Sequence, residues 1–412
     1  MSLRRSLLAG SILVGGAAAT VVAANLGIGL QRYGPTYLRR TLTRRWIPDL
    51  RDPEYFPARP IRAADRAFLL PVDPDGPEHV EAAFASIAGR HGASGETLDG
   101  FLARTRSTSL LVLHRDRLIR ESYANGASDT SLLTSMSMAK SVLSLLVVAA
   151  IADGYIPSLD VQAETLLPDI GGLRGTGITL RHLMHMVSGL RFENPRPLGW
   201  LSWEHIFDGE RVSYLTPDIV SHLATARAGQ TPGSHFSYDD RSAQLVGLAI
   251  ERATGRTVSA WLEERLWRRI GTEAGATWVL DRKGGHERME SGINARARDW
   301  LRLGRLVLRE GDWEGTAVLP RQLVREVTHA PQIIAGLADP ISRQPEYAGR
   351  SYGLFWWGLV DEPQDCLAEG ALGQVLYVAR SHDAVLLRTG GGTRDVPSWA
   401  TLLRDLAAAL PA

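Results

Sequence analysis

A strongly apolar stretch, residues 142–150, constrains the fold of this 412-residue chain more than any other feature. It reads Val-Leu-Ser-Leu-Leu-Val-Val-Ala-Ala and carries no charge. Together with the residues before it, the pattern predicts a helix over residues 137–152 that ends at Asp153-Gly154. A helix that is apolar on nearly every side is buried, so the rest of the chain has to pack around it. Lys140, near the start of this helix, is then carried into the interior.

Lysine is almost absent from the sequence. Of its 46 basic residues, only Lys140 and Lys283 are lysines, and all the others are arginines. Arginine does not lose its proton in a protein, whereas lysine can. A lysine inside a buried apolar helix therefore looks like a position where arginine would not serve. Lys283 lies in a plain loop, so composition alone does not identify an active site.

The composition is that of a globular protein, with 44% apolar and 22% charged residues. The chain is longer than one ordinary domain and long enough for a large domain with two lobes. A net charge of +1 gives no electrostatic reason to expect nucleic acid as a partner. The single cysteine, Cys366, excludes an internal disulfide and a cysteine-based zinc site, and we interpret it as a small packed residue.

No metal and no cofactor are expected from the sequence. His182 and His185 share a helical face, but no third ligand has suitable spacing, and zinc needs three or four ligands. The sequence contains no P-loop, no Gly-x-Ser-x-Gly elbow, no His-Glu-x-x-His motif and no Gly-x-Gly-x-x-Gly between a strand and a helix. The chemistry therefore has to come from ordinary side chains.

The N-terminus predicts export. Arg4 and Arg5 precede an uncharged run over residues 6–30, which is long enough to cross about 30 Å of hydrocarbon as a helix. The run fits a retained membrane anchor or a cleavable signal peptide with small-residue sites at 17–19 and 22–24. The arginines between residues 32 and 45 argue mildly against an anchor whose C-terminal side faces outward. We expect a periplasmic or extracellular protein, with anchoring to the cytoplasmic membrane through residues 6–30 left open.

Secondary-structure patterns divide the rest of the chain into a linker and one large domain. Residues 31–76 have little periodicity and are interpreted as a linker or wrapping segment, and residues 77–412 as one domain. Helical patterns cover 78–89, 179–186, 242–253, 297–308 and 398–409, and strand patterns cover 110–114, 118–123, 352–360, 373–378 and 384–387. Strands near both ends with helices between them predict an α+β fold, in which a mostly helical lobe, roughly residues 150–330, is inserted into one sheet.

The predicted chemistry centres on Ser137 and Lys140. Three residues apart on one helix, their side chains lie on the same face and can meet. A serine hydroxyl is a poor nucleophile until a base takes its proton, and lysine is such a base only if burial and neighbours lower its pKa. Free backbone N–H groups at the helix start can supply half of an oxyanion hole. The alternative is an ordinary helix start, with Ser135 as cap and Lys140 on a solvent face, because Ser-x-x-Lys also arises by chance.

A set of motifs in a fixed order resembles the serine β-lactamase, penicillin-binding-protein and esterase superfamily over roughly residues 107–391. Its parts are Glu121-Ser122-Tyr123, Ser137-Met138-Ala139-Lys140-Ser141, Leu159-Asp160 to Leu167-Pro168, the stretch 178–190, Phe236-Ser237-Tyr238 running into Gln244-Leu245-Val246-Gly247, Arg298-Asp299 and Gly370-Ala371-Leu372-Gly373-Gln374. Class C β-lactamase relatives often carry His at the position of Met186. With methionine there, this motif is similar to that of the 6-aminohexanoate-dimer hydrolase and carboxylesterase branch. The resemblance implies a β-lactamase-like fold, with an antiparallel sheet built from N- and C-terminal strands and flanked by helices.

The resemblance also implies roles for individual residues. Ser137 would be the acylated nucleophile, Lys140 its general base and Tyr238 the shuttle that carries the proton to the leaving group. A tyrosine suits this role only if a cation stabilises its phenolate, and Lys140 is the obvious candidate. The backbone N–H groups of Ser137 and Ala371 would form the oxyanion hole.

Asp240 departs from the family pattern, because many relatives have Asn at this position. Its charge is expected near Tyr238, where it would weaken the binding of a substrate amide. Asp239 and Asp240 also fit a helix cap, so Tyr238 read by itself is a packed loop residue before a helix. Asp240 is thus a candidate pocket residue that differs from the Asn of many relatives.

The third family element, Lys-Thr-Gly or His-x-Gly, is replaced here by Ala368-Glu369-Gly370. In β-lactamases that cation holds the substrate carboxylate, so its loss beside the acidic Glu369 argues against penicillins. Gly370 and Ala371 still fit the role that the resemblance implies for this backbone, in which the Ala371 N–H is an oxyanion donor. Glu369 and Gly370 join Asp240 as candidate pocket residues.

The sequence therefore predicts an exported serine hydrolase that acts on small esters or linear amides through an acyl-enzyme on Ser137. Within the same chemistry, the alternative is a β-lactamase or D-alanyl peptidase. An alternative of another class is a catalytically silent, membrane-tethered protein that binds cell-wall fragments or a partner. No pattern in the sequence fixes the substrate or the oligomeric state.

Overall fold

A large antiparallel sheet joins the two ends of the chain. The computed structural model describes residues 2–43, 49–192, 197–202, 209–329, 349–392, 396 and 398–411, with the side chains of 2–16, 209 and 210 outside the description. Within these residues the sheet has seven strands in the order β11-β12-β13-β14-β15-β2-β3. They are β11 Arg350–Gly353, β12 Trp356–Leu359, β13 Glu362–Gly370, β14 Gln374–Ala379, β15 Ala384–Gly390, β2 Ser107–His114 and β3 Arg117–Tyr123. The C-terminal β15 pairs with the N-terminal β2, as the predicted α+β fold requires.

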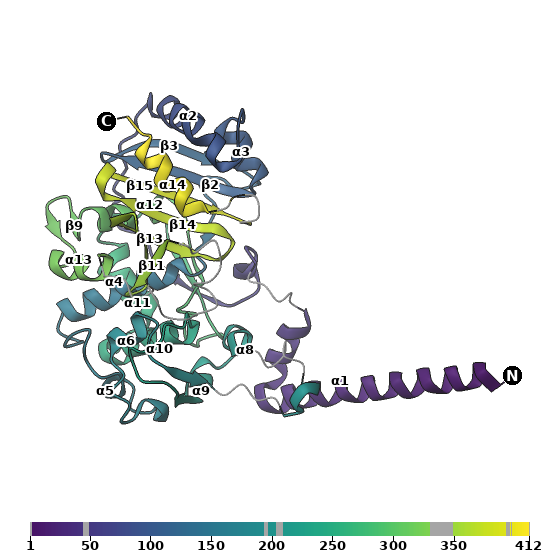
Figure 1. Cartoon of the computed structure of the whole chain (residues 1–412). Coiled ribbons are helices and arrows are strands. Elements are labelled where there is room, and N and C mark those ends of the chain that lie inside the picture. Colours follow the sequence, from purple (N-terminus) through teal and green to yellow (C-terminus); the bar gives the residue numbers. More distant parts are fainter. Residues whose placement is uncertain are drawn as a thin grey trace.

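Helices cover both faces of this sheet (Figure 1). They are α2 Gly76–Ile87, α3 Leu98–Arg104, α4 Met138–Ala152, α12 Ala297–Leu308 and α14 Trp399–Ala408. Strand β14 contacts α4, α12 and α14, and all six of its residues are buried. The sheet is therefore the middle layer of the domain.

The helical lobe lies beyond α4, in the lower part of Figure 1. Its helices are α5 Ala163–Leu166, α6 Leu180–Met184, α8 Gly209–Leu215, α9 Ile219–Leu223, α10 Asp240–Thr254 and α11 Val258–Leu262, with a strand pair β5 Leu190–Phe192 and β6 Ala226–Ala228. A smaller sheet has the order β1-β7-β8-β4, with β1 Ala58–Ile61, β7 Ala276–Val279, β8 Ile293–Ala295 and β4 Leu133–Thr134. Helix α13 Arg321–Thr328 and the pair β9 Asp312–Trp313 and β10 Thr316–Ala317 complete the described elements.

The apolar helix α4 is the centre of the molecule, as its sequence predicts. Its residues from Met138 to Ala150 are all buried. It contacts α10 of the lobe on one side and β13 of the large sheet on the other. Because one buried helix touches both parts, residues at its N-terminus lie where the lobe and the sheet meet.

Two strand predictions needed correction. The pattern at 352–360 was interpreted as one strand, but the structure has a hairpin of β11 and β12, which turns at Leu354 and Phe355 with φ angles of 51° and 70°. Strand β13 was not predicted. It begins with Glu362, Pro363, Gln364 and Asp365, residues of low strand propensity. Its pairing with β12, and with β14 from Cys366 onward, overrides that preference.

Helix α1, Ser2–Thr43, extends away from the domain at its N-terminal end (Figure 1). In the part of the chain that the structure describes, no helix is both long and apolar enough to cross a membrane. The side chains of residues 6–16, the first part of the uncharged run, lie outside the description. The helix bends at Gly34, whose φ of 81° is not helical, next to Pro35.

The C-terminal part of α1 packs on the lobe. Tyr37 is buried in a small apolar cluster with Phe56, Val212, Leu215 and Val279. Arg40 donates hydrogen bonds to Leu215 O at 3.0 Å and to Asp281 O at 2.8 Å. The segment 31–76, predicted as a linker or wrapping segment, thus contains docked residues and the strand β1, which pairs with β7.

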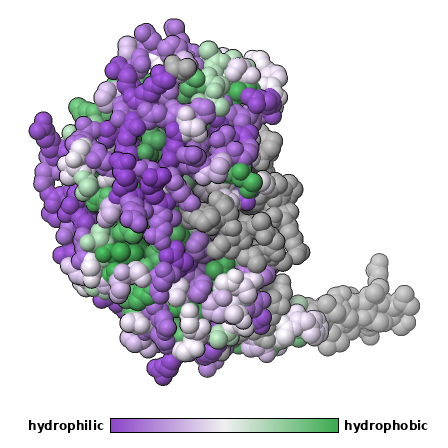
Figure 2. Space-filling model, turned by 60° about the vertical axis from the view of Figure 1, so that its left-hand side comes forward, coloured by the Kyte–Doolittle hydropathy of each residue, from purple (hydrophilic) through white to green (hydrophobic). Residues whose placement is uncertain are grey.

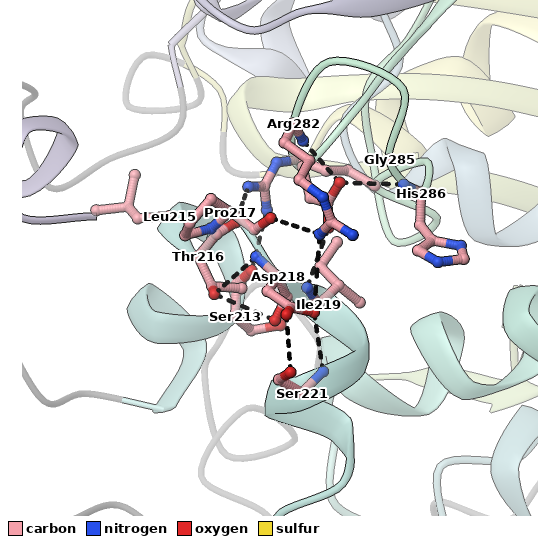
Figure 3. Close-up of polar contacts among 12 residues, drawn as sticks. Ser213, Leu215, Thr216, Pro217, Asp218, Ile219, Ser221, Arg282, Gly285 and His286 are labelled. Carbon is pink, nitrogen blue, oxygen red and sulfur yellow. Dashed lines mark hydrogen bonds and ion pairs between the residues drawn. The ribbon is translucent and has the colours of Figure 1, made fainter. Parts of the chain in front are cut away.

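A polar network holds the residues on which α1 rests (Figure 3). The buried carboxylate of Asp281 accepts from Ile219 N at 3.1 Å and from His286 N at 3.0 Å. Arg282 donates to Pro217 O at 2.8 Å, and Asp218 accepts from Ser221 N at 3.1 Å. The start of α9 and the turn after β7 are thereby tied together.

Hydrophilic residues cover most of the face drawn in Figure 2, with hydrophobic residues gathered in its lower half. The lower half is the part of the molecule that contains the helical lobe (Figure 1). The sheet layer therefore presents the more polar of the two surfaces in this view.

Gly304 provides a test of the packing of α12 on the sheet. A Cβ atom at this position would lie 2.4 Å from Val385 Cγ1 and 3.0 Å from Leu376 Cδ1. We expect Gly304→Ala to lower the free energy of unfolding by about 1–3 kcal/mol, because overpacking outweighs the helix preference of alanine. Chemical denaturation measures the change. Gly27→Ala in α1 is the control, since nothing lies within 4 Å of its added Cβ; equal or higher stability of Gly304→Ala would contradict the packing.

Candidate active site

Ser137 and Lys140 meet at the N-terminus of α4. Ser137 is the residue before the first turn of the helix, and Lys140 Nζ donates a hydrogen bond to Ser137 Oγ at 2.8 Å. Lys140 is only 1% exposed. Ser135, also buried, accepts from Ile293 N at 3.2 Å and does not cap the helix. The alternative of an ordinary helix start, with Lys140 in solvent, is therefore wrong.

Three elements supply partners to the Lys140 ammonium. Besides Ser137 Oγ, its Nζ donates to Glu290 O at 3.0 Å and forms an ion pair with Asp240 Oδ1 at 2.7 Å. Asp240 is the first residue of α10, and Glu290 lies between β7 and β8. The charge of Asp240, expected beside Tyr238, is thus directed at Lys140.

The charged neighbours of Lys140 act on its pKa in opposite directions from burial. Burial lowers the pKa of Lys140, but the carboxylate of Asp240 raises it, as do Tyr238 and Glu290, and the net direction is upward. The condition that a lysine base requires, a lowered pKa, is therefore not met by the neighbours present in the substrate-free site. Without a substrate, the protonated amine is the favoured state.

Tyr238 lies beside the same ammonium. Its ring centroid is 5.0 Å from Lys140 Nζ, and its hydroxyl forms side-chain hydrogen bonds with Ser137 and Lys140. Burial raises the pKa of Tyr238 and Lys140 lowers it, with a net rise. Asp239 caps α10 by accepting from Arg241 N at 2.8 Å. Tyr238 is thus a residue before a helix cap, as its isolated sequence predicts, and also a neighbour of the nucleophile.

Aromatic rings pack behind Tyr238. Its ring is stacked on Trp357, with centroids 6.0 Å apart, and meets the edge of Tyr352 at 5.6 Å. Tyr352 and Trp357 come from the hairpin of β11 and β12 and are buried. The large sheet therefore fixes the orientation of a side chain that belongs to the lobe.

Strand β13 passes against the nucleophile at Gly370. A Cβ atom on Gly370 would lie 2.6 Å from Ser135 O and 2.8 Å from Ser137 N, so only glycine fits. Ala371 follows directly, which brings its backbone N–H to the neighbourhood of Ser137. The predicted oxyanion pair thus comes from neighbouring segments.

Glu369 does not face the nucleophile. Side chains alternate along β13, so Glu369 lies on the face opposite to Ala368 and Gly370. Its carboxylate pairs with Arg350 of β11, with Oε2 2.8 Å from Nη1. Sequence reasoning missed Arg350, because pairing between β11 and Glu369 depends on a hairpin that no local pattern predicts.

Glu290 and Gln244 were also missed as neighbours of the site. Glu290 is 2% exposed, and Gln244 Nε2 donates to its Oε2. Burial raises the pKa of Glu290 to about 7, against the lowering effect of Arg288. Gln244 belongs to a motif of the resemblance, whereas the carbonyl of Glu290 that binds Lys140 has no sequence signal, since every residue carries one.

The histidines considered as metal ligands have local roles. His182 Nδ1 accepts from Thr179 N at 3.1 Å in the capping box of α6. Burial lowers the pKa of His185 to about 4, which keeps it neutral. Both side chains belong to the packing of the lobe.

Comparison with known proteins agrees with the fold. The sequence profile described as Beta-lactamase matches residues 96–383, well over half of the chain. The 6-aminohexanoate-dimer hydrolase of Paenarthrobacter ureafaciens is 23% identical over 335 residues, which cover 76% of this chain and 81% of that protein.

Solved structures share the fold. A Bacillus anthracis protein named as a candidate 6-aminohexanoate-dimer hydrolase superimposes with a TM-score of 0.71 at 22% identity, covering 87% of this chain and 93% of that one. The D-stereospecific amidohydrolase from a Streptomyces species gives a TM-score of 0.53 at 18% identity, covering 81% and 98%. The predicted β-lactamase-like fold is confirmed. The chain belongs to the β-lactamase family and is a serine hydrolase of that fold.

Proposed function

We propose that the protein hydrolyses small esters or linear amides through an acyl-enzyme on Ser137. The observation that carries the proposal is the contact of Lys140 Nζ with Ser137 Oγ at 2.8 Å, with Tyr238 hydrogen-bonded to both side chains. A nucleophile, a base and a group that can pass on the proton lie within reach of one another. The 6-aminohexanoate-dimer hydrolase relative supports a linear amide as one substrate class.

The proposed reaction begins when the Lys140 ammonium releases one proton to solvent. The neutral amine takes the proton of Ser137, and Oγ attacks the substrate carbonyl carbon. The backbone N–H groups of Ser137 and Ala371 stabilise the oxyanion. The proton then passes from Lys140 through Tyr238 to the leaving group as the bond to that group breaks. Water hydrolyses the resulting ester of Ser137 and releases the acid.

The candidate residues for substrate contact are Asp240 and Gly370, with Asp240 30% exposed at the side chain and partly open to a ligand. Glu369, the third candidate, contributes through its pair with Arg350 and not by direct contact. Strand β13 has Ala368 at the position where β-lactamases carry the cation that binds the substrate carboxylate. The nearby Arg350 of β11 is paired with Glu369. This arrangement favours substrates without an essential carboxylate at that place.

The first test uses the two lysines of the chain. Lys140→Arg keeps the charge beside Asp240 but removes a group that can become neutral, so kcat/KM for a chromogenic short-chain ester should fall at least about 10³-fold. Ser137→Ala should cause a similar loss. Lys283→Arg, the same substitution in a loop, is the matched control and should retain full activity. Rates of Lys140→Arg equal to those of the wild type would contradict the role of the amine.

The second test concerns Asp240. Its carboxylate stabilises the ammonium form of Lys140, so Asp240→Asn should lower the pKa of Lys140 and shift the rising limb of kcat/KM to lower pH, by about 1–3 units. More neutral amine is then present near pH 8, and kcat/KM rises there. The pH profile with the same ester measures the shift. Asp239→Asn, next in sequence and paired with Arg241 instead, is the control; an unshifted profile in Asp240→Asn would count against Lys140 as the base.

Labelling experiments separate this function from its alternatives. A fluorophosphonate should label Ser137, and short-chain esters should protect it. A covalent adduct of a labelled penicillin at Ser137 would instead favour a β-lactamase or D-alanyl peptidase. Folded protein that neither reagent labels would favour a catalytically silent binding protein.

We also propose that the protein is exported and that residues 6–30 act as the export signal. The docked part of α1 supports a cleavage near residue 19 or 24, because Asn25, which follows both sites, donates to Leu201 O at 3.2 Å. Cleavage there leaves Tyr37 and Arg40 in place. Mass spectrometry of the protein from the periplasmic or extracellular fraction should show an N-terminus near residue 20 or 25. An intact N-terminus on protein found only in the cytoplasm would contradict export.

A further inference from the structure

A buried arginine lies behind the turn that follows Gly370. Arg388 of β15 is 0% exposed. Among the described residues its hydrogen bonds go only to neutral oxygens, and burial alone lowers its pKa, to about 9. Burying a guanidinium without a carboxylate is costly, so its hydrogen bonds have to compensate.

The shortest hydrogen bonds of Arg388 reach the turn Ala371–Gly373. Nη1 donates to Gly373 O at 2.7 Å and to Leu372 O at 2.9 Å. The remaining bonds go to Ser107 Oγ at 3.0 Å, Thr105 O at 3.1 Å and Gly392 O at 3.3 Å, and the guanidinium carbon lies 4.0 Å from the ring centroid of Trp399. One side chain therefore joins the turn to the start of β2 and to α14.

The turn has a backbone conformation that needs support. Leu372 has a φ of 66° and Gly373 a φ of 80°, both in the left-handed region, which is costly for leucine. A Cβ atom on Gly373 would lie 2.5 Å from Arg388 Nη1 and 2.8 Å from Trp399 Cδ1. The turn thus packs directly against the Arg388 guanidinium, with no space for a side chain at Gly373.

This turn begins at Ala371, whose backbone N–H is the second donor in the proposed oxyanion hole. We propose that Arg388 is a positioning residue, which holds the turn Ala371–Gly373 so that the Ala371 N–H points at the reacting carbonyl on Ser137. The inference rests on the proposed function. Arg388 acts through the backbone and does not touch the reacting atoms. Lysine cannot replace it, because an ammonium lacks the planar fork that reaches several carbonyls at once.

The test compares an ester with its thionoester, in which sulfur replaces the carbonyl oxygen and accepts hydrogen bonds poorly. In the full-length protein, Arg388→Lys should lower kcat for the ester at least about tenfold, with KM within about threefold. The loss for the thionoester should be smaller, because its reaction depends less on the N–H donors. Arg302→Lys is the control: Arg302 of α12 is equally buried but pairs with Asp299, and any loss should be the same for both substrates.

Hydrogen exchange of the backbone amides at 371–374 provides a readout that does not depend on turnover. It should be faster in Arg388→Lys than in the wild type and unchanged in Arg302→Lys. If Arg388→Lys fails to fold, Gly373→Ala perturbs the same contact from the turn and should give the same kinetic and exchange changes. Wild-type exchange in these variants, or equal losses for ester and thionoester, would overturn the proposal. An inactive wild type would refute the proposed function, while the exchange would still decide the role of Arg388.

Discussion

The site depends on the contacts made by the buried ammonium of Lys140. It joins α4, through Ser137, to the start of α10, through Asp240, and to the segment before β8, through the carbonyl of Glu290. Removing one partner from a buried ion pair leaves a charge without compensation, which is far more costly than the loss of a surface pair. The same three contacts thus assemble the site and hold the lobe against the central helix.

Asp240 has two opposite effects on the site. Its carboxylate compensates the buried charge of Lys140, but it also favours the protonated form that cannot act as a base. In the proposed mechanism, the amine has to lose a proton before Ser137 can attack. An asparagine would keep a polar contact and remove this restraint, so in the proposed mechanism the aspartate moves the rising limb of activity to higher pH. Functional sites are where local preferences are expected to conflict in this way.

Residues of the large sheet pack directly against the Ser137 backbone and the Tyr238 ring. Gly370 allows β13 to touch the backbone of Ser135 and Ser137, and the aromatic pair of Tyr352 and Trp357 packs on Tyr238. Neither contact involves a reacting atom, yet both determine where the reacting groups lie. The turn held by Arg388 extends the same principle, in which buried residues outside the site position its backbone donors.

How much the sequence predicted depended on whether the signal was local. The apolar run after Lys140 predicts the buried helix, and the spacing of Ser137 and Lys140 predicts their contact, because both follow from helical geometry. The periodic helix at residues 297–308 was predicted with its observed bounds.

Contacts between distant segments that no motif signals could not be predicted. The pairing of Arg350 with Glu369, the division of 352–360 into two strands and the direction of the Asp240 charge all depend on packing between distant parts of the chain. The ion pair of Lys140 with Asp240 belongs to the same group, since helical burial was visible in the sequence but the ion pair was not.

Trapping the acyl-enzyme tests most directly whether Ser137 is the nucleophile. The full-length protein would be mixed with a slowly hydrolysed p-nitrophenyl ester, quenched in acid during turnover and mapped by peptide mass spectrometry. We expect the mass of one acyl group to appear on Ser137 and to disappear when the substrate is exhausted. Turnover without an acyl group on Ser137, or with a transient acyl group on another residue, would contradict it.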